Sequence, residues 1–298
     1  MKLSLCDGDY LVLSDLHIGH QASAVQNVDV LTPLLVPGRT LIFNGDTFEM
    51  RRAVDREKAV KFVADLKSIL RDAGVSAVFI NGNHDPVISE VNHLECHETA
   101  VLITHGDVLF HNVAPWSLNE KLYRQAHAKE LALLSDEQKN RLDFRLAALR
   151  RATTSYDITH PVAKPGLAGS VVHFLETTWP PWRPLSIIQS WMEVPSRAEK
   201  FAKTYRPEMR TILIGHSHFA GIWERNGLRI INTGAAMTGF RPRAVRFEDH
   251  RISVERLVWS GGKLHLSSIL ASFDLAQPKI NSRPSSNTTP RPEPTGWI

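Results

Sequence analysis

Five short apolar segments, each followed directly or one glycine later by His, Asp or Asn, constrain the fold of this chain more than any other feature. Such runs, bounded by polar or glycine-containing turns, are typical of buried strands. Between the second and the third, Val54–Asp72 has apolar residues at helical spacing, and Gly74 follows it, which predicts a helix. Strands alternating with a helix predict an α/β fold with a parallel or mixed sheet flanked by helices. The five segments are Tyr10–Ser14, Thr40–Asn44, Ser76–Asn81, Thr99–Thr104 and Thr211–Gly215.

The remainder of the chain adds helices and a second set of strands. The segment Leu118–Arg151 is rich in Leu, Ala, Lys, Arg and Glu and contains neither Gly nor Pro, which predicts one or two helices. A helical pattern recurs from Leu185 to about Ala202. Further strands are expected at Gly221–Ile231, folded at an Asn226-Gly227 hairpin turn, and at Ala244–Phe247 and Ile252–Val258.

The composition is that of an ordinary globular protein, since 43% of the 298 residues are hydrophobic and 22% are charged. A small disulfide-stapled scaffold and a wholly disordered chain are excluded. We expect one catalytic domain over residues 1–277, with a cap-like helical insertion at about 111–210. Residues 278–298 form a Pro/Ser-rich tail that we expect to be disordered. The net charge of +4 is uneven, with 9 basic against 15 acidic side chains in 1–110 and 15 against 10 in 111–210.

Cysteine content and hydropathy indicate the compartment. Cys6 and Cys96 are the only cysteines and form no CxxC pair, so neither a disulfide framework nor a thiolate zinc site is predicted. No stretch approaches the roughly 18 apolar residues needed to span a bilayer. We therefore expect a cytoplasmic protein, with peripheral contact at a membrane left open.

Polar residues at the strand ends are the candidate functional site. Asp15 and His17 lie two apart in an extended chain, so the carboxylate and the imidazole point to one side and can reach one ion. In an α/β sheet, ligands bind where the carboxyl ends of the strands meet. His, carboxylate and amide ligands suit divalent transition metals. The other four clusters are Gly45-Asp46, Gly82-Asn83-His84-Asp85, His105-Gly106-Asp107 and Gly215-His216-Ser217-His218.

Each cluster taken alone has a simpler explanation. An Asp after a strand is more often a helix cap or a turn residue than a ligand, and an isolated GNH, HGD or HSH can be a turn or a surface loop that carries a His. All five share the same context of a strand followed by ligand residues, however. That recurrence favours one shared metal site.

The order D-x-H, GD, GNHD, HGD, GHSH over residues 10–260 resembles that of the calcineurin-like metallophosphoesterase superfamily. The resemblance implies a four-layer α/β fold, with two mixed β-sheets flanked by helices and two metal ions at one edge. It also implies a hydroxide bound between ions about 3.5–4 Å apart as the nucleophile. By the same resemblance, the ligands are Asp15, His17, Asp46 and His218 for the first ion and Asp46, Asn83, His105 and His216 for the second, with Asp46 bridging.

Two further residues carry catalytic roles in the resemblance. His84 lies beside the metals without binding them and protonates the leaving oxygen or stabilises charge there. Asp85 orients His84 from behind. We expect Mn²⁺ as the ion, with Fe²⁺ or Zn²⁺ as alternatives. His20 is expected only to complete its loop, whereas His111 is either a residue that lines the site or an ordinary loop residue.

The motifs also narrow the substrate. Protein phosphatases of the superfamily read GDxVDRG and GNHE, whereas this chain has GDTFEM and GNHD, so a Ser/Thr protein phosphatase is not expected. The insertion resembles the acyl-binding lid of UDP-2,3-diacylglucosamine pyrophosphatases. The best-known branch of that family has Arg where this chain has His84, so its substrate does not transfer directly. The prediction is a phosphodiesterase or pyrophosphatase acting on a small-molecule, nucleotide- or lipid-linked substrate.

The sequence leaves open the role of the insertion and the class of function. Together with its +5 charge, the insertion's Trp116, Trp179, Trp182 and Trp191 either form a basic cap for an anionic substrate or are packing under a solvated face. A basic surface near two metals also suits a nuclease or nucleotide phosphodiesterase, although no nucleic-acid motif is evident. A non-catalytic metal-binding scaffold predicts a damaged ligand set, and no ligand is missing here. No obligate protein partner is evident.

Overall fold

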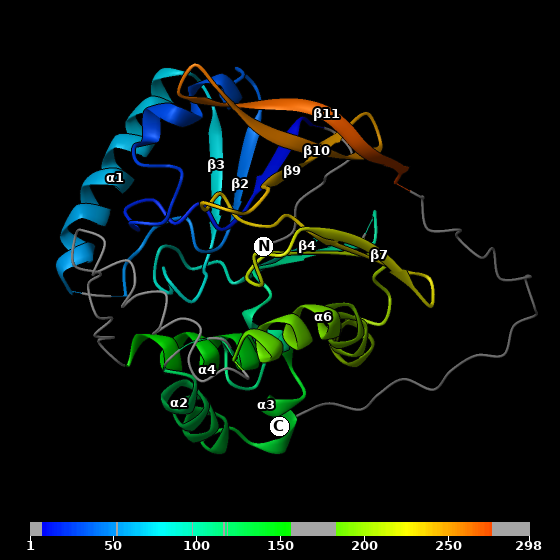
Figure 1. The fold of residues 1–298 in the computed structure, drawn as a ribbon. Helices are drawn as coiled ribbons and strands as arrows, with labels where there is room; N and C mark the ends of the chain where they lie inside the picture. The colour runs from blue at the N-terminus through cyan, green and yellow to red at the C-terminus, as the bar shows by residue number, and fades with distance from the viewer. Residues whose placement is uncertain are drawn as a thin grey trace, which may run out of the picture.

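Two β-sheets with helices on their outer faces form the fold of the computed structural model (Figure 1), which describes residues 8–51, 53–96, 98–115, 117, 119–155 and 183–275. Six strands make the first sheet in the order β11-β10-β9-β1-β2-β3, and five make the second in the order β4-β5-β6-β8-β7. Both sheets mix parallel and antiparallel pairs. The structure thus has the α/β class that the sequence predicts.

The first sheet contains the first three predicted strands side by side. Its parallel part is β1 (Tyr10–Leu13), β2 (Thr40–Asn44) and β3 (Ser76–Ile80), and its antiparallel part is β9 (Arg243–Glu248), β10 (Arg251–Ser260) and β11 (Lys263–Asp274). Val12 pairs with Ile42, and Ile42 with Val78. Because the paired residues follow one another without a register shift and the strands are parallel, the three carboxyl ends lie at one edge of the sheet.

The second sheet repeats this arrangement. Parallel strands β5 (Val101–Thr104), β6 (Thr211–Ile214) and β8 (Leu228–Asn232) lie between antiparallel edge strands β4 (His93–Cys96) and β7 (Gly221–Arg225). The predicted hairpin turn between β7 and β8 is confirmed, since Asn226 and Gly227 have φ of 49° and 79°. Two strands were not predicted from the sequence: β4, which has few apolar residues, and β11, whose side chains are largely exposed.

Helices cover the outer faces. The segment Leu118–Arg151 contains three helices rather than one or two, because Ser135 and Gln138 form a capping box that starts a new helix. None of the described helices is long and apolar enough to cross a membrane. The helices are η1 (Val28–Leu34), α1 (Ala53–Asp72), η2 (Asp107–Leu109), α2 (Glu120–Ala132), α3 (Asp136–Lys139), α4 (Leu142–Thr154) and α6 (Arg183–Tyr205).

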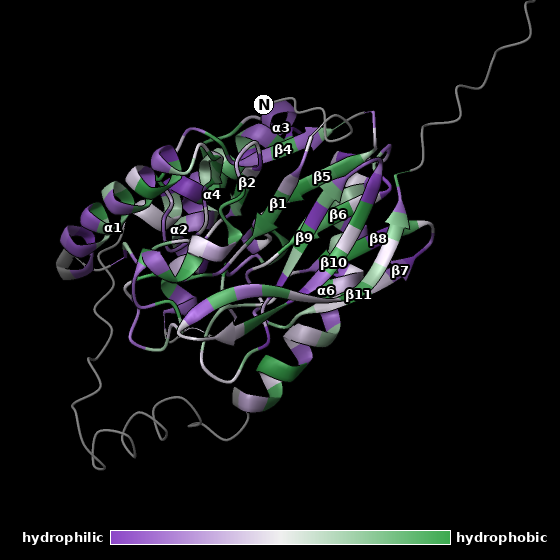
Figure 2. Ribbon diagram, turned by 90° about the horizontal axis from the view of Figure 1, so that it is seen from above, coloured by the Kyte–Doolittle hydropathy of each residue, from purple (hydrophilic) through white to green (hydrophobic). Residues whose placement is uncertain are grey.

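Three hydrophobic clusters hold these layers together. One lies between the sheets, a second joins the first sheet to α1 and η1, and a third joins the second sheet to α2, α4 and α6. Strands that are buried on both faces read as continuous apolar runs, which is why they were recognisable in the sequence. Figure 2 shows hydrophobic residues along the central strands and alternating hydrophilic and hydrophobic stretches along α1. The cluster between the sheets includes Val12, Ile42, Ile80, Ile103, Leu213 and Ile231.

A buried ion pair attaches helix α4 to η2, the short helix that follows β5. Arg150 of α4 donates to both carboxylate oxygens of Asp107, at 2.6 and 2.9 Å, and Asp107 is fully buried. Trp116, Trp179, Trp182 and the tail from residue 278 lie outside the described residues. The predicted domain limits therefore stay a prediction.

Replacing Arg150 with Met should destabilise the fold by about 3–5 kcal/mol, since it leaves the Asp107 carboxylate buried without a partner. Urea unfolding followed by circular dichroism measures this. The neighbouring pair of Arg151 with Glu130 is half exposed, so Arg151→Met should change the free energy of unfolding by only about 0–1 kcal/mol. If both substitutions lowered the free energy of unfolding equally, the stabilising role of the Arg150–Asp107 ion pair would be contradicted.

Asp9 links three segments of the first sheet by ion pairs, and these make the stability of the fold depend on pH. Its carboxylate accepts hydrogen bonds from Arg39 at 2.9 Å and from Arg246 at 3.0 Å. Burial alone would raise the pKa of Asp9, but Arg246 and Arg39 hold it below 3.8. A lowered pKa in the folded state contributes stability above 3.8, and that contribution is lost as the pH falls from 3.8 through the folded-state value.

Asp9→Asn should accordingly lower the melting temperature at neutral pH and remove part of its decline below about pH 4. Melting temperatures measured across that range test this. The matched control is Asp274→Asn, because Asp274 is exposed and lies 3.6 Å from an exposed Arg251. If the melting temperature of the Asp9 variant fell with acid as steeply as that of the wild type, Asp9 would not be the source of this pH dependence.

Candidate metal centre

Loops at the carboxyl ends of five strands bring the predicted ligands to one edge between the sheets. Asp15 and His17 follow β1, and Asp46 follows β2. The remaining ligands follow strands of both sheets: Asn83 after β3, His105 after β5, and His216 and His218 after β6. Ligands as far apart in sequence as Asp15 and His218 therefore become neighbours in space.

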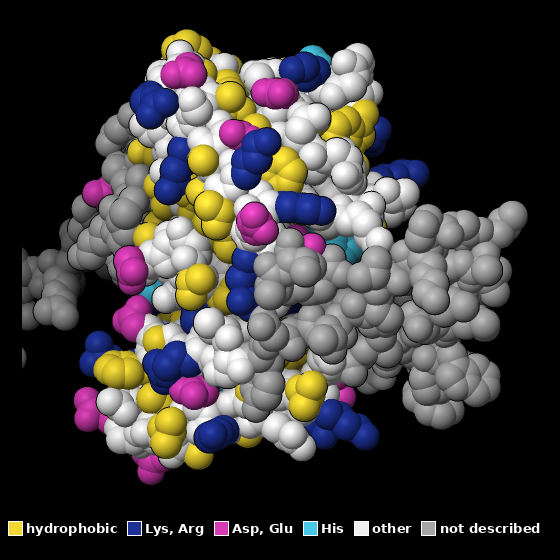
Figure 3. Space-filling model, turned by 90° about the vertical axis from the view of Figure 1, so that its left-hand side faces the viewer, with side chains coloured by type: hydrophobic (Ala, Val, Ile, Leu, Met, Phe, Trp, Pro, Cys, Tyr) yellow, Lys and Arg dark blue, Asp and Glu magenta, His cyan; other side chains and the backbone are white. Residues whose placement is uncertain are grey.

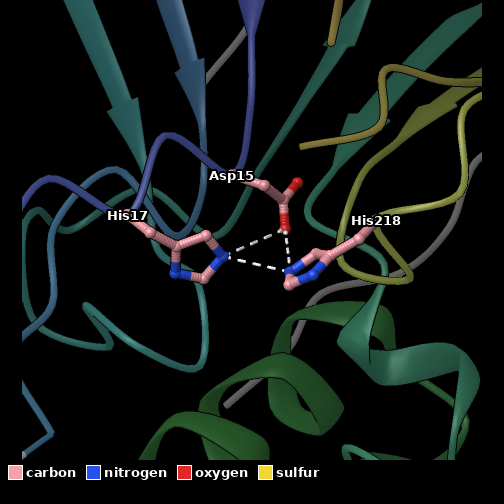
Figure 4. A group of neighbouring side chains, drawn as sticks. All are labelled: Asp15, His17 and His218. Carbon is pink, nitrogen blue, oxygen red and sulfur yellow. Dashed lines mark hydrogen bonds and ion pairs between the residues drawn. The ribbon is translucent and has the colours of Figure 1, made fainter. Parts of the chain in front are cut away.

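The first group consists of Asp15, His17 and His218, which point toward one another (Figure 4). The Nε2 atoms of the two imidazoles are 3.0 Å apart. Asp15 Oδ1 lies 3.8 Å from His17 Nε2 and 3.4 Å from His218 Nε2. Asp15 and His17 are buried, and His218 is partly exposed, so this group faces both the interior and the surface.

The second group consists of Asp46, His105 and His216, all buried. Asp46 Oδ2 lies 3.3 Å from His105 Nε2. The side-chain oxygen of Asn83 lies 3.2 Å from the same nitrogen. The groups that could bind an ion here are thus two imidazoles, one carboxylate and one amide oxygen, which fit a divalent transition ion.

Asp46 of the second group also faces the first group. Its Oδ2 atom is 3.3 Å from His105 Nε2 in the second group and 3.9 Å from His17 Nε2 in the first. Its other oxygen, Oδ1, accepts a hydrogen bond from the backbone N–H of His84 at 2.7 Å. One carboxylate oxygen therefore faces both groups, as a bridging ligand requires.

Backbone carbonyls fix two of the imidazole rings. His105 Nδ1 donates to Asn44 O at 3.0 Å, and His216 Nε2 donates to Val113 O at 2.6 Å. A ring nitrogen that donates to a carbonyl leaves the other nitrogen of a neutral imidazole able to bind metal. That nitrogen is Nε2 in His105 and Nδ1 in His216.

The backbone at the ligands is strained. Among the described residues, ten that are not glycine have positive φ, and half of them are the candidate ligands Asp15, His17, Asp46, His216 and His218. Such conformations cost about 1–3 kcal/mol each and cluster at functional sites. Glycines permit the close approach of the loops, because a Cβ at Gly82 would overlap the Asp46 carboxylate and one at Gly215 would overlap that of Asp15.

Burial and neighbouring charges shift the pKa values of the ligands in opposite directions. Burial lowers the pKa of His105, but Asp46 outweighs it and raises the value to about 10. Burial raises the pKa of Asp46, but His105 and His84 hold it well below its ordinary value. Burial lowers the pKa of His216 to about 4. Burial and the charge of His84 together lower the pKa of His17 well below its ordinary value. Since a ligand must be deprotonated, an ion at His105 competes with a proton.

His84 forms a pair with a carboxylate that is not among the predicted site residues. Its Nδ1 donates to Glu49 Oε2 at 2.6 Å, so its Nε2 faces the centre, 3.8 Å from Asp46 Oδ2. Burial raises the pKa of Glu49, but His84 and Arg51 hold it well below its ordinary value. The available signal was an acidic residue three positions after Asp46.

The predicted role of Asp85 is wrong. Its carboxylate does not orient His84, whose ring is held by Glu49. Because the loop after β2 curves around it, Asp85 instead accepts hydrogen bonds from the backbone N–H groups of Asp46, Thr47, Phe48 and Gly82, at 2.7–3.2 Å. Burial and the charge of Asp46 raise the pKa of Asp85 to about 6. Asp85 therefore fixes the loop after β2 against the loop after β3.

Other predicted residues lie around the centre. His20 Nδ1 accepts a hydrogen bond from Ala22 N at 3.1 Å, which agrees with its expected loop role. His111 is exposed and belongs to neither ligand group. Trp191 donates from Nε1 to Ser217 O at 2.9 Å and so supports the loop between His216 and His218.

Comparisons with known proteins identify no family. No protein-family model matches the chain, and no match was found among curated proteins. Vps29 of Chaetomium thermophilum is a similar solved structure, with 11% identity, a TM-score of 0.44 and coverage of 93% of this chain and 100% of that chain.

Two other solved structures are named for phosphatase or phosphoesterase activity. A cold-active protein-tyrosine phosphatase of a psychrophilic Shewanella has 13% identity and a TM-score of 0.42, and the match covers 89% of this chain and 81% of that chain. A conserved protein of Streptococcus pneumoniae, described as a predicted phosphoesterase, has 12% identity and a TM-score of 0.35, with coverage of 87% and 97%. At these values the likenesses carry no functional argument, which rests on the residues above.

Proposed function

We propose that this protein is a metal-dependent hydrolase that cleaves a phosphodiester or pyrophosphate bond with two divalent ions as cofactors. The carrying observation is the position of Asp46 Oδ2, which faces His17 of one ligand group and His105 of the other. When bound, a pair of ions neutralises phosphoryl oxygens and lowers the pKa of water. Mn²⁺ is the favoured ion, with Fe²⁺ or Zn²⁺ as alternatives.

Two of the three clusters of potential ligands among the described residues support the predicted sets. Asp15, His17 and His218 would hold the first ion, and Asn83, His105 and His216 would hold the second, while Asp46 would contact both. A non-catalytic scaffold needs no proton donor beside the ligands. The presence of His84 supports a hydrolase.

His84 is the proposed proton donor to the leaving oxygen. Glu49 accepts from its Nδ1, so the ring presents Nε2 toward Asp46 and the edge of the His17 ring. An imidazole held in this way can protonate a leaving alcohol or phosphate in the transition state. The leaving group is therefore expected on the His84 side of the centre.

A pocket of about 480 Å³ lies next to the loops after β2 and β3, lined in part by Arg51 and by Pro86, and it supports one kind of substrate. Met50, which lines it, donates its N–H to His84 O at 3.0 Å. The exposed surface inside is mostly apolar, and two arginines lie at its wall. Figure 3 shows Lys and Arg side chains interspersed with hydrophobic ones on the face that includes α1. The lining residues are Met50, Arg51, Arg56, Val60, Pro86, Val87, Thr153 and Thr154.

This lining supports a substrate that joins an anionic phosphoester to an apolar group, such as a UDP-diacylglucosamine-like or other nucleotide- or lipid-linked compound. Activity assays with Mn²⁺-loaded protein on bis-p-nitrophenyl phosphate, p-nitrophenyl phosphate and UDP-linked pyrophosphates test the proposal. We expect turnover of the diester or the pyrophosphate above that of the monoester. Inactivity on all three, with two ions bound, would establish a scaffold instead.

A further inference from the structure

A chain of polar side chains runs from the proposed proton donor into the helical insertion. His84 Nδ1 donates to Glu49 Oε2 at 2.6 Å. The other carboxylate oxygen, Glu49 Oε1, accepts from Arg51 Nε at 3.3 Å. Arg51 Nη1 then donates to Tyr123 Oη at 3.3 Å. Four side chains thus connect the metal centre with α2.

Water is largely excluded from these hydrogen-bonded side chains. Tyr123 is 1% exposed, Glu49 is 3% exposed, and the side chain of Arg51 is 8% exposed. Burial raises the pKa of Tyr123, so its hydroxyl is neutral at physiological pH. Tyr123 and Glu49 therefore have little access to solvent as an alternative partner and depend on neighbouring groups for their hydrogen bonds.

The far end of the chain is anchored by packing. Glu49 and Arg51 lie in the loop after β2, whereas Tyr123 lies in α2 and belongs to the hydrophobic cluster that includes Leu142, Leu146 and Leu149 of α4. The ring of Tyr123 is therefore held by the insertion. Its hydroxyl reaches back to Arg51 on the catalytic loop.

We propose that Tyr123 is a positioning residue for His84, acting through Arg51 and Glu49; this inference rests on the proposed function. The phenol oxygen holds the Arg51 guanidinium on Glu49 Oε1, and the carboxylate in turn orients the imidazole. Arg51 also lines the pocket beside His84, so without Tyr123 it can turn toward that space. Glu49 Oε1 then keeps only the backbone N–H of Arg51, at 3.3 Å, as a partner, and His84 Nε2 is held less firmly toward the leaving oxygen.

Tyr123→Phe separates this role from packing, because it keeps the buried ring and removes only the hydroxyl. We expect kcat to fall about tenfold for substrates with alkyl leaving groups, which need protonation. Turnover of p-nitrophenyl esters and KM for both classes should change little. The matched control is Tyr205→Phe, since Tyr205 packs against the same cluster and is remote from the chain of hydrogen bonds.

A double substitution tests the path. If Tyr123 acts through Arg51, Tyr123→Phe combined with Arg51→Met should lower kcat no further than Arg51→Met alone. Additive losses, or equal losses on both leaving-group classes, would overturn the positioning role. An active wild type that Tyr123→Phe leaves unaffected would overturn this role alone. A wild type inactive on every substrate would overturn the proposed function and this role with it.

Discussion

Replacing Asp46 with Asn is expected to lower kcat/KM by at least about a thousandfold, which corresponds to ~4 kcal/mol of transition-state stabilisation. Its Oδ2 faces both ligand groups, so one substitution weakens both. Asn keeps the size of the side chain and an oxygen that can accept from His84 N, so the local fold should persist. What is lost is the negative charge that two cations share.

Metal content by mass spectrometry and steady-state kinetics on the same samples test this expectation. The Asp46→Asn variant should bind fewer than two ions per chain. Asp29→Asn is the matched control, because Asp29 is exposed in η1 and should leave both measurements unchanged. Near-normal turnover with two ions bound to the Asp46 variant would remove the bridging role.

Replacing His84 with Ala is expected to leave metal binding intact and to lower turnover of poor leaving groups by about 10²–10⁴-fold. The ring contributes no atom to the two proposed ligand sets, while its Nε2 faces the centre. p-Nitrophenolate departs without protonation, so esters of this leaving group should be affected far less. A steeper dependence of rate on leaving-group pKa is the signature of a missing general acid.

Rates for a series of aryl and alkyl phosphodiesters measure that dependence. His265→Ala serves as the control, because His265 lies in β11 of the first sheet and outside both ligand groups. Normal turnover of alkyl diesters by the His84 variant would refute the assignment. A loss of bound metal would instead make His84 a ligand.

Much of this architecture could be predicted because its signals are local. The central strands are buried on both faces, so they form uninterrupted apolar runs, and the candidate ligands follow them directly. The ligand Asp46 is one glycine beyond β2, and His105 immediately follows β5. The meeting of these residues at one edge then needed only the rule that ligands bind where the carboxyl ends of the strands meet.

The rest depends on contacts between distant segments. Asp85 was expected to hold His84, but it accepts from N–H groups up to 39 positions away, because the loop after β2 curls around it. Glu49 became the partner of His84 for the same reason. Edge strand β11 alternates apolar residues only in two short runs, 264–266 and 269–273, and its register against β10 shifts between them. Neither loop curvature nor edge pairing is encoded in neighbouring residues.

The left-handed backbone at the ligands has a consequence for how this sequence can change. At Asp15 or His17, glycine would relieve the strained φ and favour the fold, but it would delete a proposed metal ligand. Selection for stability and selection for metal binding therefore act in opposite directions at these positions. A library screened only for thermal resistance should accumulate glycine there and lose the metal centre. One screened for bound metal should keep Asp and His and gain its stability elsewhere.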